Sequence, residues 1–202
     1  MAADTSRARW REVVAAGFGG DPGMVAAALD DDDPTVRELA LGAAARLGTL
    51  DTARLVAAFA DPDPSVRRRA VELAATRTTV DLLGPLHDDD PTVVEHAAWA
   101  CGEHVEVSEA IIARLLVLAE QSEVALVRES AVAALGAIGD PRGLPAILRG
   151  CRDLPAVRRR AVLALAPFDG PEVEAAVEAA LGDRDWQVRQ AAEDLQRAWG
   201  DS

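Results

Sequence analysis

Tyrosine is absent from this sequence, and aromatic residues of all kinds make up only 3% of its 202 residues. Half of the residues are nevertheless hydrophobic. Because large aromatic side chains are scarce, the interior has to be built from Ala, Val and Leu, which fill a core only when backbones approach closely. This composition favours short helices packed tightly against one another, since Ala and Leu are strong helix formers.

Cysteine is also scarce, and the chain has only Cys101 and Cys151. Two cysteines exclude a disulfide framework and a zinc site made of cysteine alone, so we interpret both as small buried hydrophobic side chains. Long apolar runs are missing as well, and the amino-terminal stretch MAADTSRARWREVV has no hydrophobic signal-peptide segment. We therefore expect a soluble protein of the cytoplasm with no membrane partner.

Basic residues are outnumbered by acidic ones. The sequence has 21 Lys and Arg residues against 34 Asp and Glu residues, which gives a formal net charge of −13 at pH 7. A protein that binds DNA or RNA has to neutralise phosphates with a basic face, and this surface would on average repel them. The charge balance therefore argues against a nucleic-acid partner.

A repeated pattern runs through the whole chain. The segment DPTVRELALGAAARLG from Asp33 returns as DPSVRRRAVELA from Asp63 and as DPTVVEHAAWACG from Asp90, and looser copies follow. One valine anchors each copy: Val36, Val66, Val93, Val127, Val157 and Val188. Small or apolar residues recur four and seven positions after each anchor, and also eight positions after it in every copy but the last, which places them on one face of an α-helix. This Ala-rich face lets a neighbouring helix approach closely.

Each repeat also holds a shorter apolar segment ahead of its anchored helix, and we interpret it as the first helix of a pair. The third of these segments is VDLLGPLH, residues 80–87. Between the two helices lies a turn with Asp-Pro, in which Asp caps the next helix and Pro suits its first position. Four glycines fit the opposite helix ends, where a left-handed residue is favoured: Gly48, Gly102, Gly136 and Gly139.

One pair of helices about thirty residues long cannot bury its apolar face alone, whereas stacked pairs share one continuous core. We therefore predict an all-α fold, a right-handed α-solenoid of about six helical hairpins behind an amino-terminal capping helix. Polar residues at both ends predict a monomer. The expected division is a single domain over 1–202, with the cap at 1–20 and repeats at about 21–48, 49–77, 78–104, 105–139, 140–169 and 170–200.

The repeats resemble HEAT repeats, in particular the short HEAT-like repeats of phycobilisome lyases. The line VRESAVAALGAIGDPRGLPAIL, residues 127–148, is close to a consensus copy of that motif. The resemblance implies a ladder between neighbouring repeats, formed by the turn Asp and by the Arg that follows the anchor Val. Val94 stands in place of that Arg in the third copy, so we expect the ladder to break and the superhelix to be irregular there.

Residues of the second helices form the candidate binding face. Positions two, three and six after each anchor point away from the packed stripe, and in a solenoid such positions line the concave surface that partners use. Trp and Arg are common at binding hot spots, and Trp99 falls between two arginine pairs. The alternative is that Trp99 only packs over the first helix of a neighbouring repeat. The selected residues are Arg68, Arg69, Glu95, His96, Trp99, Glu129, Arg159 and Arg160.

The stretch EHAAWACGEH, residues 95–104, also raises the question of a metal site, since His and carboxylates bind iron or zinc. Glu95 and His96 resemble, in reversed order, the His-Glu pairs that hold iron in the HEAT-like deoxyhypusine hydroxylases. That chemistry needs such pairs on several repeats, and the matching positions of the other repeats hold no His. His104 joins His96 only if the chain folds back after Gly102. We therefore predict no metal and no cofactor.

These observations predict a non-enzymatic scaffold or adaptor that presents its concave face to a protein or peptide. The mixed strip of Arg, Glu and Trp suggests a ligand with acidic groups near an apolar anchor. Alternative hypotheses are a lyase or chaperone subunit similar to phycobilin lyases, a metal-dependent hydroxylase-like HEAT protein, and a structural spacer. A DNA-binding solenoid similar to the HEAT-like alkylpurine glycosylases is a poor match, because that family relies on a basic concave surface.

Overall fold

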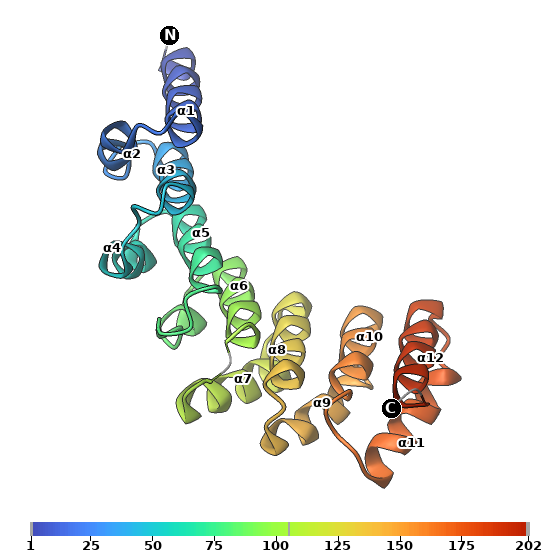
Figure 1. Cartoon of the computed structure of the whole chain (residues 1–202). Coiled ribbons are helices and arrows are strands. Elements are labelled where there is room, and N and C mark those ends of the chain that lie inside the picture. Colours follow the sequence, from blue (N-terminus) through green and yellow to red (C-terminus); the bar gives the residue numbers. More distant parts are fainter. Residues whose placement is uncertain (1, 105, 201–202) are drawn as a thin grey trace.

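The computed structural model of the protein describes residues 2–104 and 106–200, and within them it contains helices and turns and no β-strand. The helices alternate along the chain between two rows that run side by side (Figure 1). The prediction of an all-α solenoid is confirmed. None of the described helices combines the length and the hydropathy that a membrane crossing requires.

The inner row consists of the helices that carry the valine anchors, preceded by the first helix of the chain. Each packs against the next in the row. The alanines seven positions after the anchor make this approach close: Ala134 lies against Gly102, and Ala164 lies against Gly136. The members are α1 (Ala2–Gly19), α3 (Pro34–Arg46), α5 (Pro64–Ala74), α6 (Pro91–Gly102), α8 (Ala125–Ile138), α10 (Pro155–Ala164) and α12 (Trp186–Gly200).

The outer row consists of the shorter first elements of the pairs. Each packs against the anchored helix of its own repeat, which closes the core between the two rows. The members are α2 (Pro22–Ala28), α4 (Thr52–Ala57) with the 3-10 turn η1 (Ala58–Ala60), the 3-10 turn η2 (Pro85–His87), α7 (Glu109–Gln121), the 3-10 turn η3 (Pro141–Gly143) with α9 (Leu144–Gly150), and α11 (Pro171–Leu181).

The two rows bend together, and the bend decides which face is concave. In Figure 1 the inner row descends from α1 to α6 and then turns to run across through α8, α10 and α12, while the outer row lies on the outside of the bend. The inner row therefore lines the concave side. The change of direction lies next to the third repeat, where the sequence predicts an irregularity.

The helix pair predicted for the third repeat is only half present. VDLLGPLH forms no α-helix, and only the 3-10 turn at Pro85–His87 is helical. Gly84 and Pro85 explain the difference, because Gly disfavours a helix interior and Pro lacks the N–H group that a helix needs. Leu82 and Leu86 are nevertheless fully buried, so the segment still fills its share of the core.

The expected Asp caps are present at the amino-terminal ends of the inner helices. Asp33, Asp63 and Asp90 accept hydrogen bonds from the backbone N–H two residues on, at 3.0, 2.9 and 2.8 Å. Val124 and Leu154 occupy the same position before α8 and α10, where neither provides a side-chain cap. Both are exposed, by 41% and 55%, so these two helices lack the capping hydrogen bond that α3, α5, α6 and α12 have.

Two of the four glycines do not play the predicted role. Gly48 and Gly139 follow helices with a φ of +69°, as a left-handed helix end requires. Gly136 instead lies inside α8 and Gly102 is the last residue of α6, and neither has a positive φ. A Cβ at Gly136 would lie 2.5 Å from the Cβ of Ala164. The absence of a side chain there permits the close stacking of α8 and α10, a requirement that only the neighbouring helix imposes.

The Arg-Asp ladder implied by the HEAT resemblance is present and has the expected gap, but its carboxylates belong to an Asp that precedes the cap position and not to the capping Asp of Asp-Pro. In each complete rung the Arg guanidinium donates two hydrogen bonds to the turn Asp of the next repeat and one or two more to backbone carbonyls of its own turn. The rungs are Arg37–Asp61, Arg67–Asp88, Arg128–Asp153 and Arg158–Asp183, with bonds to the carboxylates of 2.7 to 2.8 Å. Val94 cannot donate, and Ser122 stands where the next turn Asp would be, so this rung lacks both partners.

The ladder begins one helix earlier than predicted. Arg9 of α1 donates to both carboxylate oxygens of Asp31, at 2.8 and 3.0 Å. The indole Nε1 of Trp10 donates to Asp33 at 3.2 Å. The amino-terminal helix therefore packs on α3 in the same way as each other inner helix packs on the next.

Candidate functional site

A groove of about 410 Å³ opens between α6 and α8, with α10 at its edge. We call it the α6–α8 groove. It lies on the inner row, on the concave side of the bend. Its larger lining residues are Glu95, Trp99 and Glu103 from α6 and its carboxyl end, Leu126, Glu129 and Ser130 from α8, and Arg160 from α10; small residues complete the lining.

Small side chains create the groove. Gly102 approaches α8 so closely that a Cβ there would lie 3.2 Å from the Cα of Ala134. Ala133 and Ala137, which also line the groove, are too small to fill the space beside the indole of Trp99. Trp99 therefore remains 41% exposed. Trp99 thus borders the groove, and its role in binding stays a prediction.

A polar network holds the Glu95 side of the groove. The Ser130 hydroxyl donates to Oε1 of Glu95 at 2.8 Å, while Oε2 lies against Nδ1 of His96. The same Nδ1 is 2.9 Å from the backbone carbonyl of Thr92, one turn earlier in α6. Glu95 is thus positioned from both α6 and α8, and its carboxylate forms one wall of the groove.

The arginines of the predicted strip are already next to carboxylates. Arg159 and Arg160 of α10 both approach Oε1 of Glu129, at 3.6 and 3.7 Å. On α5, Arg69 forms an ion pair with Glu72 of its own helix at 2.6 Å, and Arg68 lies 3.8 Å from Glu38 of α3. Little of the strip's positive charge is left without a negative neighbour.

The structure brings only some of the eight predicted residues together. Glu95, Trp99, Glu129 and Arg160 line one groove. His96 and Arg159 adjoin it through their contacts with Glu95 and Glu129. Arg68 and Arg69 pair with α3 and with their own helix and do not line it. The expected placement of Trp99 between two arginine pairs therefore reduces to a single arginine, Arg160, on the α10 side.

Three groove residues were missed by the sequence analysis. Glu103 follows the helical part of α6, and Leu126 immediately precedes its anchor Val127, so neither occupies a position in the repeat pattern that points inward. Ser130 occupies the same position as His96 in its own repeat. The register that the repeats share could have indicated Ser130. Nothing in the repeat pattern marks Glu103 or Leu126.

The two histidines of residues 95–104 do not converge. His104 is buried, and its Nε2 lies 3.1 Å from the carbonyl of Ala74 at the end of α5. It therefore satisfies a helix end of the neighbouring repeat. Within the described residues, no three His, Cys, Asp or Glu side chains are grouped so that they could hold a metal ion.

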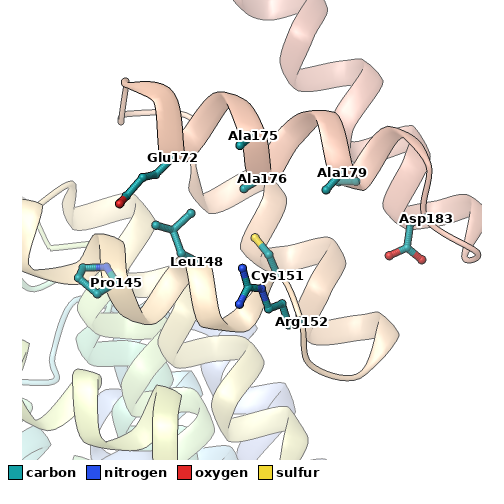
Figure 2. A pocket seen from close by; sticks show the side chains of 10 residues that line it. Pro145, Leu148, Cys151, Arg152, Glu172, Ala175, Ala176, Ala179 and Asp183 are labelled. Carbon is teal, nitrogen blue, oxygen red and sulfur yellow. The ribbon is translucent and has the colours of Figure 1, made fainter.

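A second groove, of about 590 Å³, lies in the outer row between α9 and α11. Figure 2 shows Leu148 and Cys151 facing the alanines of α11, with Glu172 and Asp183 near the two ends of that helix. The alanines are short and α9 makes little direct contact with α11. The groove is therefore explained as a gap between two outer helices that are held apart by their inner partners.

Neither cysteine has the properties of a nucleophile. Burial raises the pKa of the Cys151 thiol to about 11, although Arg152 acts in the opposite direction. Burial also raises the pKa of Cys101 to about 12. Both thiols are protonated at neutral pH, while nucleophilic attack requires the thiolate. Cys101 is the buried side chain that the sequence predicts, whereas Cys151 is only partly buried.

Comparisons with known proteins agree with this geometry. A family model described as HEAT repeats matches residues 79–154, and a search of curated proteins gave no match. Among solved structures, the designed armadillo repeat protein YIII(Dq)4CqI is 18% identical with a TM-score of 0.61, covering 88% of this chain and 98% of that one. A related design solved in complex with peptide (KR)4 has a TM-score of 0.63 at the same identity and coverage. Human deoxyhypusine hydroxylase in complex with glycerol is 18% identical with a TM-score of 0.50, covering 96% and 80%. At these identities the likenesses concern the fold.

Proposed function

The chain is a HEAT-repeat protein, and we propose that it is a non-enzymatic scaffold that binds a protein or peptide through the concave face of its inner row. The α6–α8 groove is the proposed centre of this face. The observation that carries the proposal is the exposed indole of Trp99 beside an open groove on the concave side. Aromatic side chains in such positions are typical anchors of protein interfaces.

The area left exposed on Trp99 is large enough to matter for binding. A tryptophan exposes on the order of 250 Å² when fully accessible, so 41% exposure leaves about 100 Å². At about 25 cal/mol per Å², covering that surface is worth about 2.5 kcal/mol. A change of this size is a loss of nearly two orders of magnitude in affinity when the indole is removed.

Exposed aliphatic side chains at the ends of α8 and α10 support the same location. Val124 and Leu154 replace the capping Asp of other repeats, at a cost in helix stability of about 1 kcal/mol each. Leu126 and Leu163 add two further exposed apolar side chains on these helices. Folding alone favours Asp at the cap positions, so exposed apolar residues there are better explained by a partner that covers them.

The structural likenesses support a scaffold role. The designed armadillo protein solved with the peptide (KR)4 has a similar fold over 88% of this chain. We propose that this chain also binds a peptide segment, and that it does so through its concave face. We propose no catalytic role for Glu95 and His96, because both are engaged by Ser130 and Thr92 and because His104 is bonded to α5.

Site-directed photo-cross-linking tests the proposal. A photoreactive amino acid replaces Leu126, which is 51% exposed at the groove, or Val56 in the outer row as a matched control. In cells of the source organism, irradiation is expected to give discrete protein adducts from position 126 and none of the same adducts from position 56. Trp99→Ala in the same chain is expected to abolish them.

The melting temperature of each variant separates loss of binding from loss of folding. Adducts that persist undiminished in the Trp99→Ala variant, or that form equally from position 56, would contradict a binding role for the concave groove. Identification of the captured protein by mass spectrometry then provides a purified partner for a direct affinity measurement with the same variants.

A further inference from the structure

We infer that the α6–α8 groove binds a basic side chain, Lys or Arg, of its partner, with the cationic group between the Trp99 ring and the carboxylates of Glu95 and Glu103. The inference rests on the proposed function and deepens it, because it names the chemistry of the partner. It also reverses the sign of the ligand charge that the sequence suggests.

The groove has an excess of negative charge. Three carboxylates line it, those of Glu95, Glu103 and Glu129, against the single guanidinium of Arg160. Arg160 and Arg159 both lie near Glu129 and neutralise it. Glu103 is exposed, and its carboxylate makes no hydrogen bond or ion pair within residues 2–104 and 106–200. With both arginines counted, one negative charge remains in excess, and neither arginine forms an ion pair with Glu95 or Glu103.

The Glu95 carboxylate is fixed where a cation can reach it. Ser130 holds one oxygen from α8 and His96 contacts the other from α6. A carboxylate held in place from two helices loses little side-chain entropy when it binds a cation. Partial burial also reduces the screening of its charge by water and salt, so an ion pair here is stronger than one on an open surface.

Trp99 adds the second element of cation recognition. The face of an indole attracts Lys and Arg more strongly than that of any other aromatic residue. Leu126, which is half exposed on the opposite helix, offers apolar surface for the methylene groups of such a side chain. An acidic side chain would gain from neither the ring nor the carboxylates.

The rest of the molecule favours the same sign of charge. The arginines that would attract an acidic ligand already lie beside Glu38, Glu72 or Glu129. The net charge of the whole chain is −13. A negative protein attracts a basic partner over distances of about a Debye length, which speeds association at low salt.

Zero-length cross-linking provides a direct test, because the chain contains no lysine and all 21 of its basic residues are arginine. The probe is an amino-terminally acetylated peptide of eight residues in which Ala and Lys alternate. A carbodiimide joins a peptide amine to a carboxylate only when the two are in contact. Mass spectrometry is expected to find the amide bonds concentrated at Glu103 and Glu95 rather than spread over the 34 Asp and Glu residues.

Fluorescence anisotropy measures the affinity with labelled peptides of the same design that carry Lys, Arg, Gln or Glu. We expect the Lys and Arg peptides to bind at least tenfold more tightly than the Gln and Glu peptides at low salt. Trp99→Leu is expected to lower the affinity for the Lys peptide about five- to tenfold. Glu95→Gln with Glu103→Gln is expected to lower the same affinity about tenfold.

A matched control separates a local site from general charge attraction. Glu38→Gln with Glu72→Gln removes the same charge from the same row of helices but outside the groove. We expect this pair of changes to alter the affinity less than twofold. An effect equal to that of the Glu95 and Glu103 changes would overturn the inference.

The remaining outcomes distinguish the inference from the proposed function. A Gln peptide that binds as tightly as the Lys peptide and still depends on Trp99 overturns the cationic site and leaves the scaffold role standing. A Glu peptide that binds best and is lost in Arg160→Gln overturns the sign of the charge. If neither the Lys nor the Arg peptide binds, the inference fails, and cross-linking from position 126 decides the proposed function by itself.

Discussion

Restoring the missing rung of the Arg-Asp ladder is the most informative change to make in this fold. The rung is empty because Val94 and Ser122 replace the Arg and Asp of the other repeats. A cavity of about 350 Å³ lies there, lined among others by Val94 and Ser122. In the double variant Val94→Arg with Ser122→Asp, the new guanidinium is expected to bind the new carboxylate and the backbone carbonyls of Asp88 and Asp89, as Arg67 does one repeat earlier with Asp61 and Pro62.

The expected magnitudes follow from the environment of Val94, which is only 6% exposed. Val94→Arg alone removes apolar burial and places a positive charge in a partly buried pocket that Arg114 also lines, with no carboxylate at position 122 to pair with it. We therefore expect a loss of about 2 to 3 kcal/mol in the free energy of unfolding. Ser122→Asp alone is expected to change it by less than about 1 kcal/mol. The completed bidentate pair returns about 2 kcal/mol of coupling, because hydrogen bonds between charged groups are among the strongest in proteins.

Urea unfolding of the parent, the two single variants and the double variant measures this coupling as a double-mutant cycle. Urea is preferred to guanidinium chloride because it leaves ion pairs unscreened. Arg128→Met and Asp153→Asn form the matched cycle on an intact rung. Coupling below about 0.5 kcal/mol at both rungs would refute the view that the ladder stabilises the stacking. Coupling only at Arg128 would show that the third and fourth repeats are offset too far for a rung.

Three further predictions concern the stability of the fold. Gly136→Ala is expected to lower the free energy of unfolding, measured in urea, by about 1 to 3 kcal/mol, because the new Cβ meets the backbone of Ala164 at 2.6 Å. Gly19→Ala is the control, since open space surrounds Gly19, and it should be neutral or slightly stabilising. Equal effects of the two substitutions would contradict the packing argument. Val124→Asp is expected to raise stability by about 0.5 to 1 kcal/mol through a new helix cap, and a lower melting temperature would show that Val124 contributes packing instead. The pKa values of the ladder aspartates are lowered in the folded state. At Asp153 and Asp183 the guanidinium bonds are the main cause. At Asp61 and Asp88 burial raises the pKa, but the guanidinium bond, a backbone hydrogen bond and the nearby arginine charge together lower it further. The stabilisation that these aspartates contribute is therefore complete above the unfolded pKa near 4 and is lost as the pH falls below it. Melting temperatures measured from pH 7 to pH 3 should accordingly drop at the acid end. A flat profile would mean that the ladder contributes nothing to stability.

The elements predicted well are those whose signal is local and repeated. Each anchor Val and the small residues after it mark a buried helical stripe, and each turn Asp at a cap forms a hydrogen bond within two residues of itself. The ladder gap at Val94 was predicted because one missing donor is visible against five copies that have it. The first half of the third repeat was predicted wrongly, since buried leucines gave a helical pattern that Gly84 and Pro85 interrupt.

The sequence by itself determined the helical pairs, their buried stripes, their caps and the row of positions that face the concave side, because hydrophobic periodicity and capping act over a few residues. Only the tertiary structure decided which of those positions share a groove. Glu103 and Leu126 are far apart in the chain, yet both line the groove that Trp99 borders, because Gly102 allows α6 and α8 to approach closely and because small alanines leave space unfilled. The offset between successive helices depends on side-chain volumes at each contact, and these volumes act together only once the rows are stacked.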